Sequence, residues 1–138
     1  MTRKRVGQAE MEKIEMIRLL LVDDQPVVRK GLRMRLTMEP DITVVGEAST
    51  GEEALVLVQK LVPDIVLMDV EMPGMDGITT TQVIHASIPQ SAVVMLSIYD
   101  DAHTRTRAQA AGAAGFVEKR GAIETLLAMI RETAKFTT

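Results

Sequence analysis

Residues 65–77, IVLMDVEMPGMDG, decide the fold and raise its main question. Residues 65–68 form a continuous apolar run of strand length, which is typical of a strand buried on both faces of a parallel sheet. Asp69 follows this run directly, and Pro73 and Gly74 mark a turn soon afterwards. A charged side chain at the end of a buried strand costs free energy unless it is paired. The segment therefore predicts a central strand with a polar site at its carboxyl end.

Four other apolar runs have the same character and alternate with helical patterns. The expected strands cover residues 17–22, 42–48, 65–68, 92–96 and 115–117. The first expected helix begins near Pro26, and the second lies between a cap at Ser49 or Thr50 and Pro63. The third runs from Asp76 to about His85, and the fourth from Asp100 or Asp101 to near Gly112. The inner face of the last helix is formed by Ile123, Leu126, Leu127 and Ile130. Alternating strands and helices predict an α/β protein with helices on both faces of a parallel sheet. Right-handed crossovers favour a doubly wound, flavodoxin-like fold with strand order 2-1-3-4-5.

The composition excludes several classes of function. The 138 residues suit one domain, and the formal net charge of −3 gives no general attraction to nucleic acid. There is no cysteine, which excludes disulfides, cysteine-ligated zinc and thiol catalysis. The apolar runs are only strand-length, so no membrane span is expected. We expect residues 1–15 to be a flexible tail, with a basic arm that contacts a partner as the alternative, and residues 16–138 to form the folded domain.

Polar residues stand at the carboxyl ends of the expected strands. Asp23 and Asp24 follow the first strand, Asp69 the third, Ser97 the fourth and, after Glu118, Lys119 the fifth. Ligands of doubly wound sheets bind at this edge, between the first and third strands. Three carboxylates there would repel one another and take up protons, whereas an oxygen-liganded Mg²⁺ ion removes the conflict.

The positive charge of Lys119 and the hydroxyl of Ser97 would then suit a phosphoryl group beside the metal. Each residue alone also has an ordinary structural interpretation. Asp23, Asp24 or Ser97 could cap a helix, Asp69 could belong to a turn, and Lys119 could be a surface charge. Their joint position at one edge of one sheet favours the metal and phosphoryl site.

At this point the sequence is similar to a known family. The stretches LLLVDDQPVVRKGLRMRL, IVLMDVEMPGMDG, VVMLS and AGAAGFVEK resemble the receiver domain of two-component response regulators, from residue 17 to about residue 133. The stretch EPDITVVGEASTGEEAL resembles the NarL/FixJ subfamily, whose full-length members usually carry a C-terminal LuxR-type helix-turn-helix. The resemblance implies the receiver fold and a signalling role, not an enzyme that turns over a substrate.

The resemblance also implies a role for each residue at the acidic edge. Asp69 would accept a phosphoryl group from a phosphohistidine of a sensor histidine kinase. Asp24 would bind Mg²⁺ directly and Asp23 through water, while Asp69 and the backbone carbonyl of Glu71 would complete the protein ligands. These assignments come from the family and not from the spacing alone.

The remaining implied residues belong to the switch. Lys119 would pair with the phosphoryl oxygens, Ser97 would move in to hydrogen-bond one of them, and Phe116 would be the rotating aromatic residue. The resemblance implies a cytoplasmic protein that forms a homodimer on phosphorylation. It would have no membrane partner, and it would bind DNA only through an output domain that this chain does not contain.

The sequence departs from the usual family pattern at four positions. Ser97 replaces the commoner Thr and keeps the hydroxyl, and Phe116 replaces the commoner Tyr and loses a polar tip. Ile98 stands where a small residue is frequent, which would narrow access to Asp69. Arg120 stands where Pro is frequent, so the usual cis-Pro turn is absent. None of these changes removes a group that phosphorylation needs.

Other functions remain as alternatives. A receiver-like interaction module that is never phosphorylated is one of them. A haloacid-dehalogenase-type phosphohydrolase is a second, with Glu71 as the general acid, and a flavodoxin-like flavin binder is a third. Glu71, Ile98 and Tyr99 are expected around the site mouth, where they would tune the phosphoryl lifetime. His85 and His103 are expected at the surface, so no phosphohistidine relay within the chain is predicted.

Overall fold

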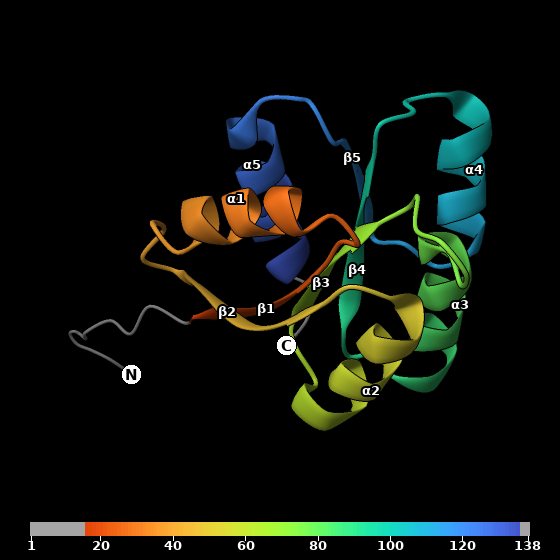
Figure 1. Cartoon of the computed structure of the whole chain (residues 1–138), viewed down its shortest axis with the longest axis horizontal. Coiled ribbons are helices and arrows are strands. Elements are labelled where there is room, and N and C mark those ends of the chain that lie inside the picture. Colours follow the sequence, from red (N-terminus) through yellow and green to blue (C-terminus); the bar gives the residue numbers. More distant parts are fainter. Residues whose placement is uncertain (1–15, 136–138) are drawn as a thin grey trace.

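The apolar runs form a five-stranded parallel sheet, seen nearly edge-on in Figure 1. The computed structural model describes residues 16–135, so the tail expected at residues 1–15 lies outside the described residues. The strands are β1 (Ile17–Val22), β2 (Ile42–Ala48), β3 (Ile65–Asp69), β4 (Ala92–Ser97) and β5 (Gly115–Glu118). Their order is β2-β1-β3-β4-β5, which confirms the predicted doubly wound topology. β1 and β3 are therefore direct neighbours, although β2 and two helices lie between them in sequence.

Helices cover both faces of this sheet, as predicted. They are α1 (Pro26–Leu36), α2 (Gly51–Leu61), α3 (Gly77–Ser87), α4 (Ala102–Ala110) and α5 (Ile123–Ala134). Figure 1 shows α1 and α5 on one side of the sheet and α2, α3 and α4 on the other. Thr50, Asp76 and Asp101 cap three of them by accepting the backbone N–H three residues later. None of the helices in residues 16–135 has the length and apolar character needed to cross a membrane.

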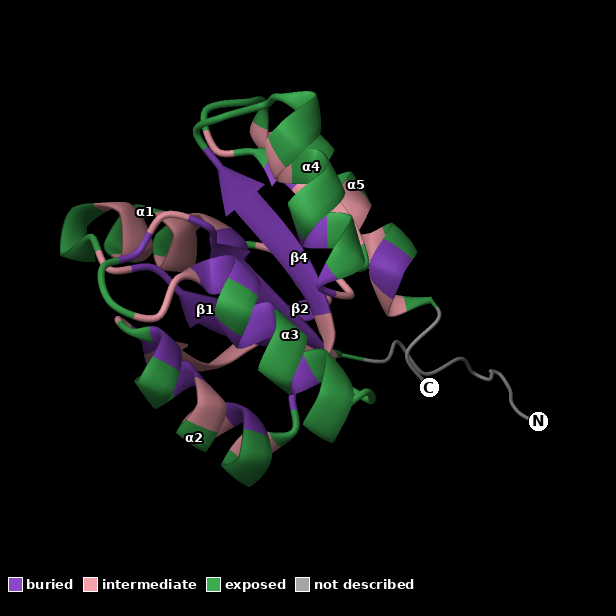
Figure 2. Cartoon of the chain, turned by 90° about the vertical axis from the view of Figure 1, so that its right-hand side faces the viewer, coloured by how far each residue is buried: buried purple, intermediate pink, exposed green. Residues whose placement is uncertain are grey.

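The core has two halves because side chains alternate along each strand. Leu19 and Leu21 of β1 pack toward α1 and α5, whereas Leu20 and Val22 pack toward α2, α3 and α4. β3 lies in the middle of the sheet and is buried along its whole length. Figure 2 shows the buried strands beneath helices that are exposed on their outer faces. A charged side chain at the end of β3 is therefore largely shielded from water.

α4 differs from the other helices because it contributes little to this core. Ala108 is the one buried residue within α4, all of which the structure describes. Figure 2 shows that most of the helix surface is exposed. Its sequence, AHTRTRAQA, has no apolar stripe at helical spacing, and α4 makes only a few contacts, with β5 and α3.

The loop from β3 to α3 lies tightly against the end of its own strand. The N–H of Gly77 donates to the carbonyl oxygen of Val70 at 3.0 Å. A Cβ atom at Gly77 would lie 2.0 Å from the carbonyl oxygen of Asp69, so no larger residue fits there without moving the loop. Gly74 has a φ of 74°, a conformation that favours glycine and makes the turn. This loop fixes the direction in which the chain leaves Asp69.

Candidate functional site

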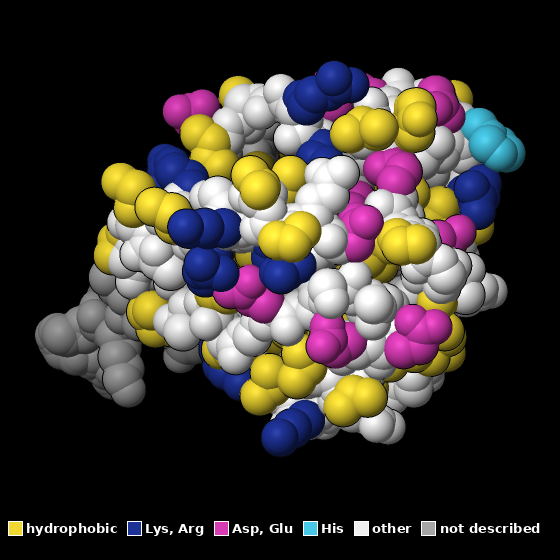
Figure 3. Space-filling model, viewed as in Figure 1, with side chains coloured by type: hydrophobic (Ala, Val, Ile, Leu, Met, Phe, Trp, Pro, Cys, Tyr) yellow, Lys and Arg dark blue, Asp and Glu magenta, His cyan; other side chains and the backbone are white. Residues whose placement is uncertain are grey.

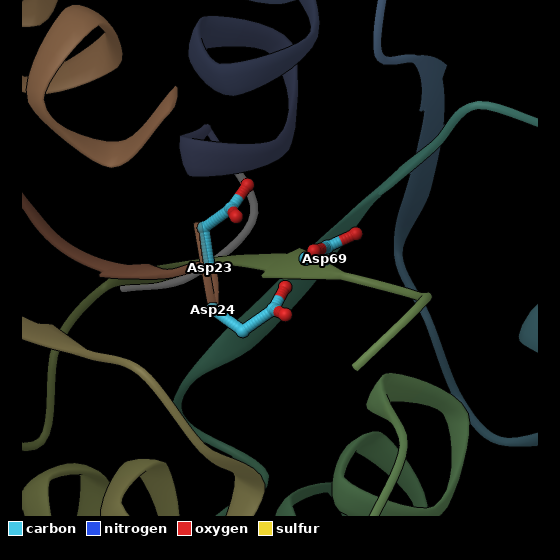
Figure 4. A group of neighbouring side chains, drawn as sticks. All are labelled: Asp23, Asp24 and Asp69. Atoms are coloured by element: carbon cyan, nitrogen blue, oxygen red, sulfur yellow. The ribbon is translucent and has the colours of Figure 1, made fainter. Parts of the chain in front are cut away.

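The three aspartates predicted at the sheet edge lie together. Asp23 and Asp24 follow β1, and Asp69 is the last residue of β3, one position beyond the paired residues Val22 and Met68. One carboxylate oxygen from each aspartate can be chosen so that all three lie within 4.8 Å of one another. Figure 4 shows these side chains reaching from the two adjacent strand ends into the same region. The adjacency of β1 and β3 thus brings the predicted carboxylates into one site.

A cavity of about 390 Å³ opens at this place. Its walls come from the loops after β1, β3, β4 and β5. The lining residues are Asp24, Gln25, Val28, Asp69, Glu71, Ile98, Lys119 and Arg120. The acidic groups therefore face a space that a small ligand can enter, with an apolar rim at Val28 and Ile98.

Asp23 is held by the turn between β1 and α1. Its Oδ1 accepts the backbone N–H of Gln25 at 2.9 Å, and its carbonyl oxygen accepts a hydrogen bond from Arg29 at 2.6 Å. Gln25, not an aspartate, is the N-cap residue of α1. The helix-cap interpretation is therefore wrong for both aspartates. Asp23 supports the turn with one carboxylate oxygen and directs the other, Oδ2, into the site.

Lys119 lies between two of the aspartates and is not a surface charge. Its Nζ is 2.9 Å from Oδ2 of Asp23 and 3.2 Å from Oδ2 of Asp69, and its side chain is only 11% exposed. Within residues 16–135, neither Oδ2 atom has a hydrogen-bond partner of normal angle, so both contacts with Lys119 are primarily ionic. Burial opposes the charged ammonium, but its contacts with Asp23 and Asp69 outweigh burial and raise the pKa of Lys119.

The carboxyl group of Asp69 is strongly perturbed. Burial raises its pKa to about 7, and the negative charge of Asp23 adds to the rise, while Lys119 opposes it. One ammonium group thus compensates three neighbouring carboxylates incompletely. Buried oxygen atoms without a hydrogen-bond partner and an excess of negative charge fit a hard divalent cation such as Mg²⁺.

Ser97 is fully buried at the end of β4, next to the acidic cluster. Its hydroxyl donates to Oε2 of Glu71 at 2.7 Å and accepts the N–H of Tyr99 at 2.9 Å. Asp101 caps α4, so the helix-cap interpretation of Ser97 is wrong. The contact with the Glu71 side chain was not predicted, because the two residues are 26 positions apart and Glu71 lies in the loop after β3 while Ser97 ends β4.

Phe116 lies in β5 and is half-buried, on the strand that leads to Lys119. The guanidinium carbon of Arg105 in α4 lies 4.6 Å from the centre of its ring, a cation–π contact. Arg105 also pairs with Asp100 at 2.5 Å. No local pattern in the sequence predicts the contact between Arg105 and Phe116. His85 and His103 are exposed, as predicted.

The surface around the site carries many basic side chains, but most are paired within the chain. Figure 3 shows Lys and Arg side chains gathered over α1. Arg29 and Arg33 pair with Glu47, and Arg35 pairs with Glu39. These charges stabilise the packing of α1 against neighbouring segments and offer little free positive surface.

Comparisons with known proteins show what the chain is similar to. The family model of the response regulator receiver domain matches residues 19–131. Response regulator GacA of Pseudomonas aeruginosa is 39% identical over 117 residues, which are 85% of this chain and 55% of GacA. Nitrate/nitrite response regulator protein NarL of Escherichia coli K12 is 37% identical over 116 residues, 84% of this chain and 54% of NarL. The chain spans about half the length of these curated relatives.

A solved structure is also similar to this chain. The signal receiver domain of the putative response regulator NarL from Mycobacterium tuberculosis superimposes with a TM-score of 0.84 at 32% identity. The superposition covers 88% of this chain and 98% of that domain.

Proposed function

Because the chain belongs to the response regulator receiver family of two-component systems, within its NarL/FixJ subfamily, we propose that Asp69 accepts a phosphoryl group from a sensor histidine kinase. The observation that carries this proposal is the position of Lys119, which contacts Asp69 and Asp23 at the wall of an acidic cavity. A cation in this place stabilises the negative charge that an arriving phosphoryl group brings.

The transfer is a simple exchange of bonds. A carboxylate oxygen of Asp69 forms a new P–O bond while the P–N bond of the phosphohistidine breaks, and the imidazole nitrogen keeps the electron pair. The nucleophile must be the ionised carboxylate. Lys119 favours that form, while burial and Asp23 oppose it. Lys119 then pairs with oxygens of the transferred group.

The acidic cluster also supports a metal requirement. Asp23, Asp24 and Asp69, with the backbone carbonyl of Glu71, would hold Mg²⁺. The bound ion supplies positive charge that neutralises the carboxylates and the phosphoryl oxygens. Among the residues of the chain, Arg29 keeps the Asp23 turn in place through its hydrogen bond to the Asp23 carbonyl.

The output follows from the switch and from the rest of the protein. Ser97 hydrogen-bonds the phosphoryl group, Phe116 changes its position, and α4, β5 and α5 present a different surface to partners. We propose homodimer formation on phosphorylation, with control of transcription through a DNA-binding domain outside this chain. The NarL and GacA relatives are about twice as long as the match, which leaves room for such a domain. A further relative, transcriptional regulatory protein DegU of Brevibacillus brevis, is 34% identical over 119 residues and supports the transcription role. A receiver that takes its phosphoryl group from a sensor histidine kinase would act in the cytoplasm.

Labelling with acetyl phosphate and Mg²⁺ tests the proposed function. The expected product is a stoichiometric phosphoprotein that is stable in acid and labile in base. Asp69→Asn should remove it, while Asp76→Asn, in the same loop, should not, because Asn also caps a helix. Continuous release of phosphate at many turnovers per second would support the phosphohydrolase instead. No labelling by acetyl phosphate or by a histidine kinase would support the interaction module.

A further inference from the structure

The side chain of Glu71 makes a contact that the proposed function does not use. Its Oε2 accepts the hydroxyl hydrogen of Ser97 at 2.7 Å, and its Oε1 accepts the backbone N–H of Ile98 at 3.4 Å. The carboxylate therefore spans both polar groups at the end of β4. Glu71 and Ile98 also line the cavity that contains Asp69. The contact lies at the proposed phosphorylation site itself.

The single hydrogen of the Ser97 hydroxyl is already used in this arrangement. A hydroxyl has one hydrogen to donate, and here it is given to Glu71 while the oxygen accepts the N–H of Tyr99. A hydrogen bond to a carboxylate is charge-assisted and stronger than one between neutral groups. Ser97 therefore has no hydrogen left for a phosphoryl oxygen as long as it stays bound to Glu71.

The backbone hydrogen bonds of Ser97 limit how its hydroxyl can change partner. Ser97 pairs with Glu118 of β5, and its carbonyl oxygen accepts the N–H of Lys119 at 2.7 Å. With the strand end fixed on the proposed phosphoryl ligand Lys119, the hydroxyl changes partner by rotation about the Cα–Cβ bond. That rotation breaks the hydrogen bond to Glu71.

We propose that the Glu71 carboxylate is a positioning residue that holds Ser97 in its unphosphorylated orientation and competes with the phosphoryl group for its hydroxyl. The proposal rests on the function assigned to Asp69 above. It gives the Glu71 side chain a role separate from that of its backbone carbonyl. Removal of the side chain should therefore shift the protein toward the phosphorylated state.

Beryllofluoride in excess Mg²⁺ is a suitable probe, because it imitates the phosphoryl group and its binding is an equilibrium. We expect Glu71→Ala to bind it about tenfold more tightly than wild type, the factor that corresponds to loss of one competing hydrogen bond. Glu71→Gln keeps an acceptor but loses the charge, so its affinity should lie between the two. Glu118→Gln is the matched control: an exposed carboxylate beside Lys119 is neutralised, and the affinity should change less than twofold.

A double-mutant cycle separates competition for Ser97 from simple charge repulsion. If Glu71 acts through Ser97, Glu71→Ala should give no gain in a Ser97→Ala background. An equal gain in both backgrounds would overturn the proposal and leave only repulsion between Glu71 and the anion. Failure of the folded wild type to bind beryllofluoride would instead overturn the proposed function.

The unphosphorylated protein offers a second readout that does not depend on phosphorylation. The backbone amide proton of Ile98 should shift in the NMR spectrum of Glu71→Ala, since it loses its carboxylate acceptor. The amide of Tyr99 should shift as well, because Ser97 becomes free to rotate. Unchanged amide shifts in the folded variant would show that the carboxylate does not hold the end of β4.

Discussion

Asp69→Asn should stabilise the metal-free protein at neutral and alkaline pH. The wild-type carboxyl group is almost completely buried, and burial together with Asp23 raises its pKa to about 7 from 3.8. The native state therefore holds a proton that the unfolded chain has already released between about pH 4 and pH 7. Within this window, the contribution of Asp69 to stability is lost as the pH rises. An amide cannot ionise, so the Asn variant does not suffer this loss.

The magnitude follows from the two pKa values. A tenfold change in proton affinity is worth about 1.4 kcal/mol, so the rise from 3.8 to about 7 corresponds to at most about 4 kcal/mol. The difference between variant and wild type should be near zero at about pH 4 and should reach its full value above pH 7. The contact between Asp69 and Lys119 is already included in the pKa of about 7. Burial of the polar amide in the variant reduces the gain, so about 2–4 kcal/mol is expected at pH 8.

Urea denaturation in EDTA at pH values from 4 to 8 measures this difference. Carboxyl groups with lowered pKa values, such as Glu39 and Asp41, also make the wild-type curve depend on pH. They are the same in both proteins and cancel in the difference. Asp76→Asn serves as the control for a change of Asp to Asn. Excess Mg²⁺ should reduce the gain, because the ion binds the native wild-type site. A difference that does not change with pH, or an Asn variant that is less stable at pH 8, would refute the reasoning.

Three further predictions concern the metal, the surface and the loop. Asp24→Ala should weaken Mg²⁺ binding at least about tenfold in calorimetry, the lower limit seen even for residues that only support a ligand, and unchanged affinity would exclude Asp24 as a ligand. Arg131→Ala should cost no more than about 1 kcal/mol in urea denaturation, less at high salt, since its ion pairs with Glu39 and Asp41 are partly exposed. Gly77→Ala should cost about 1–3 kcal/mol and reduce acetyl phosphate labelling, because its methyl group would lie 2.0 Å from a backbone oxygen of β3; full stability would contradict the tight packing of this loop.

The fold was predictable because its signals are local and agree with one another. Each strand is a short apolar run, and Thr50, Asp76 and Asp101 cap helices where polar residues precede helical patterns. The site could be predicted because strand order places the ends of β1 and β3 side by side. The predicted boundaries differ slightly: Asp69 belongs to β3 itself, and α3 continues to Ser87. Element ends depend on tertiary hydrogen bonds more than on local composition.

Contacts between side chains on different segments of the chain could not be predicted. The carboxylate of Glu71 contacts Ser97, and Arg105 contacts Phe116, because the complete fold brings these residues together. Glu71 has a recognisable position in the sequence, but several rotamers of its side chain satisfy the same pattern. The same holds for the double contact of Lys119, whose position is predictable and whose choice of Asp23 and Asp69 oxygens is not.

The weak attachment of α4 determines how readily this helix unfolds locally. With Ala108 as the one buried side chain within it, α4 can unfold locally at a small fraction of the free energy needed to open the sheet. Its amide hydrogens should therefore exchange with solvent well before those of β3 and β4, and before those of α5, which buries Leu126, Leu127 and Ile130. A rearrangement at the sheet edge can then change the order of one helix while the strands remain intact.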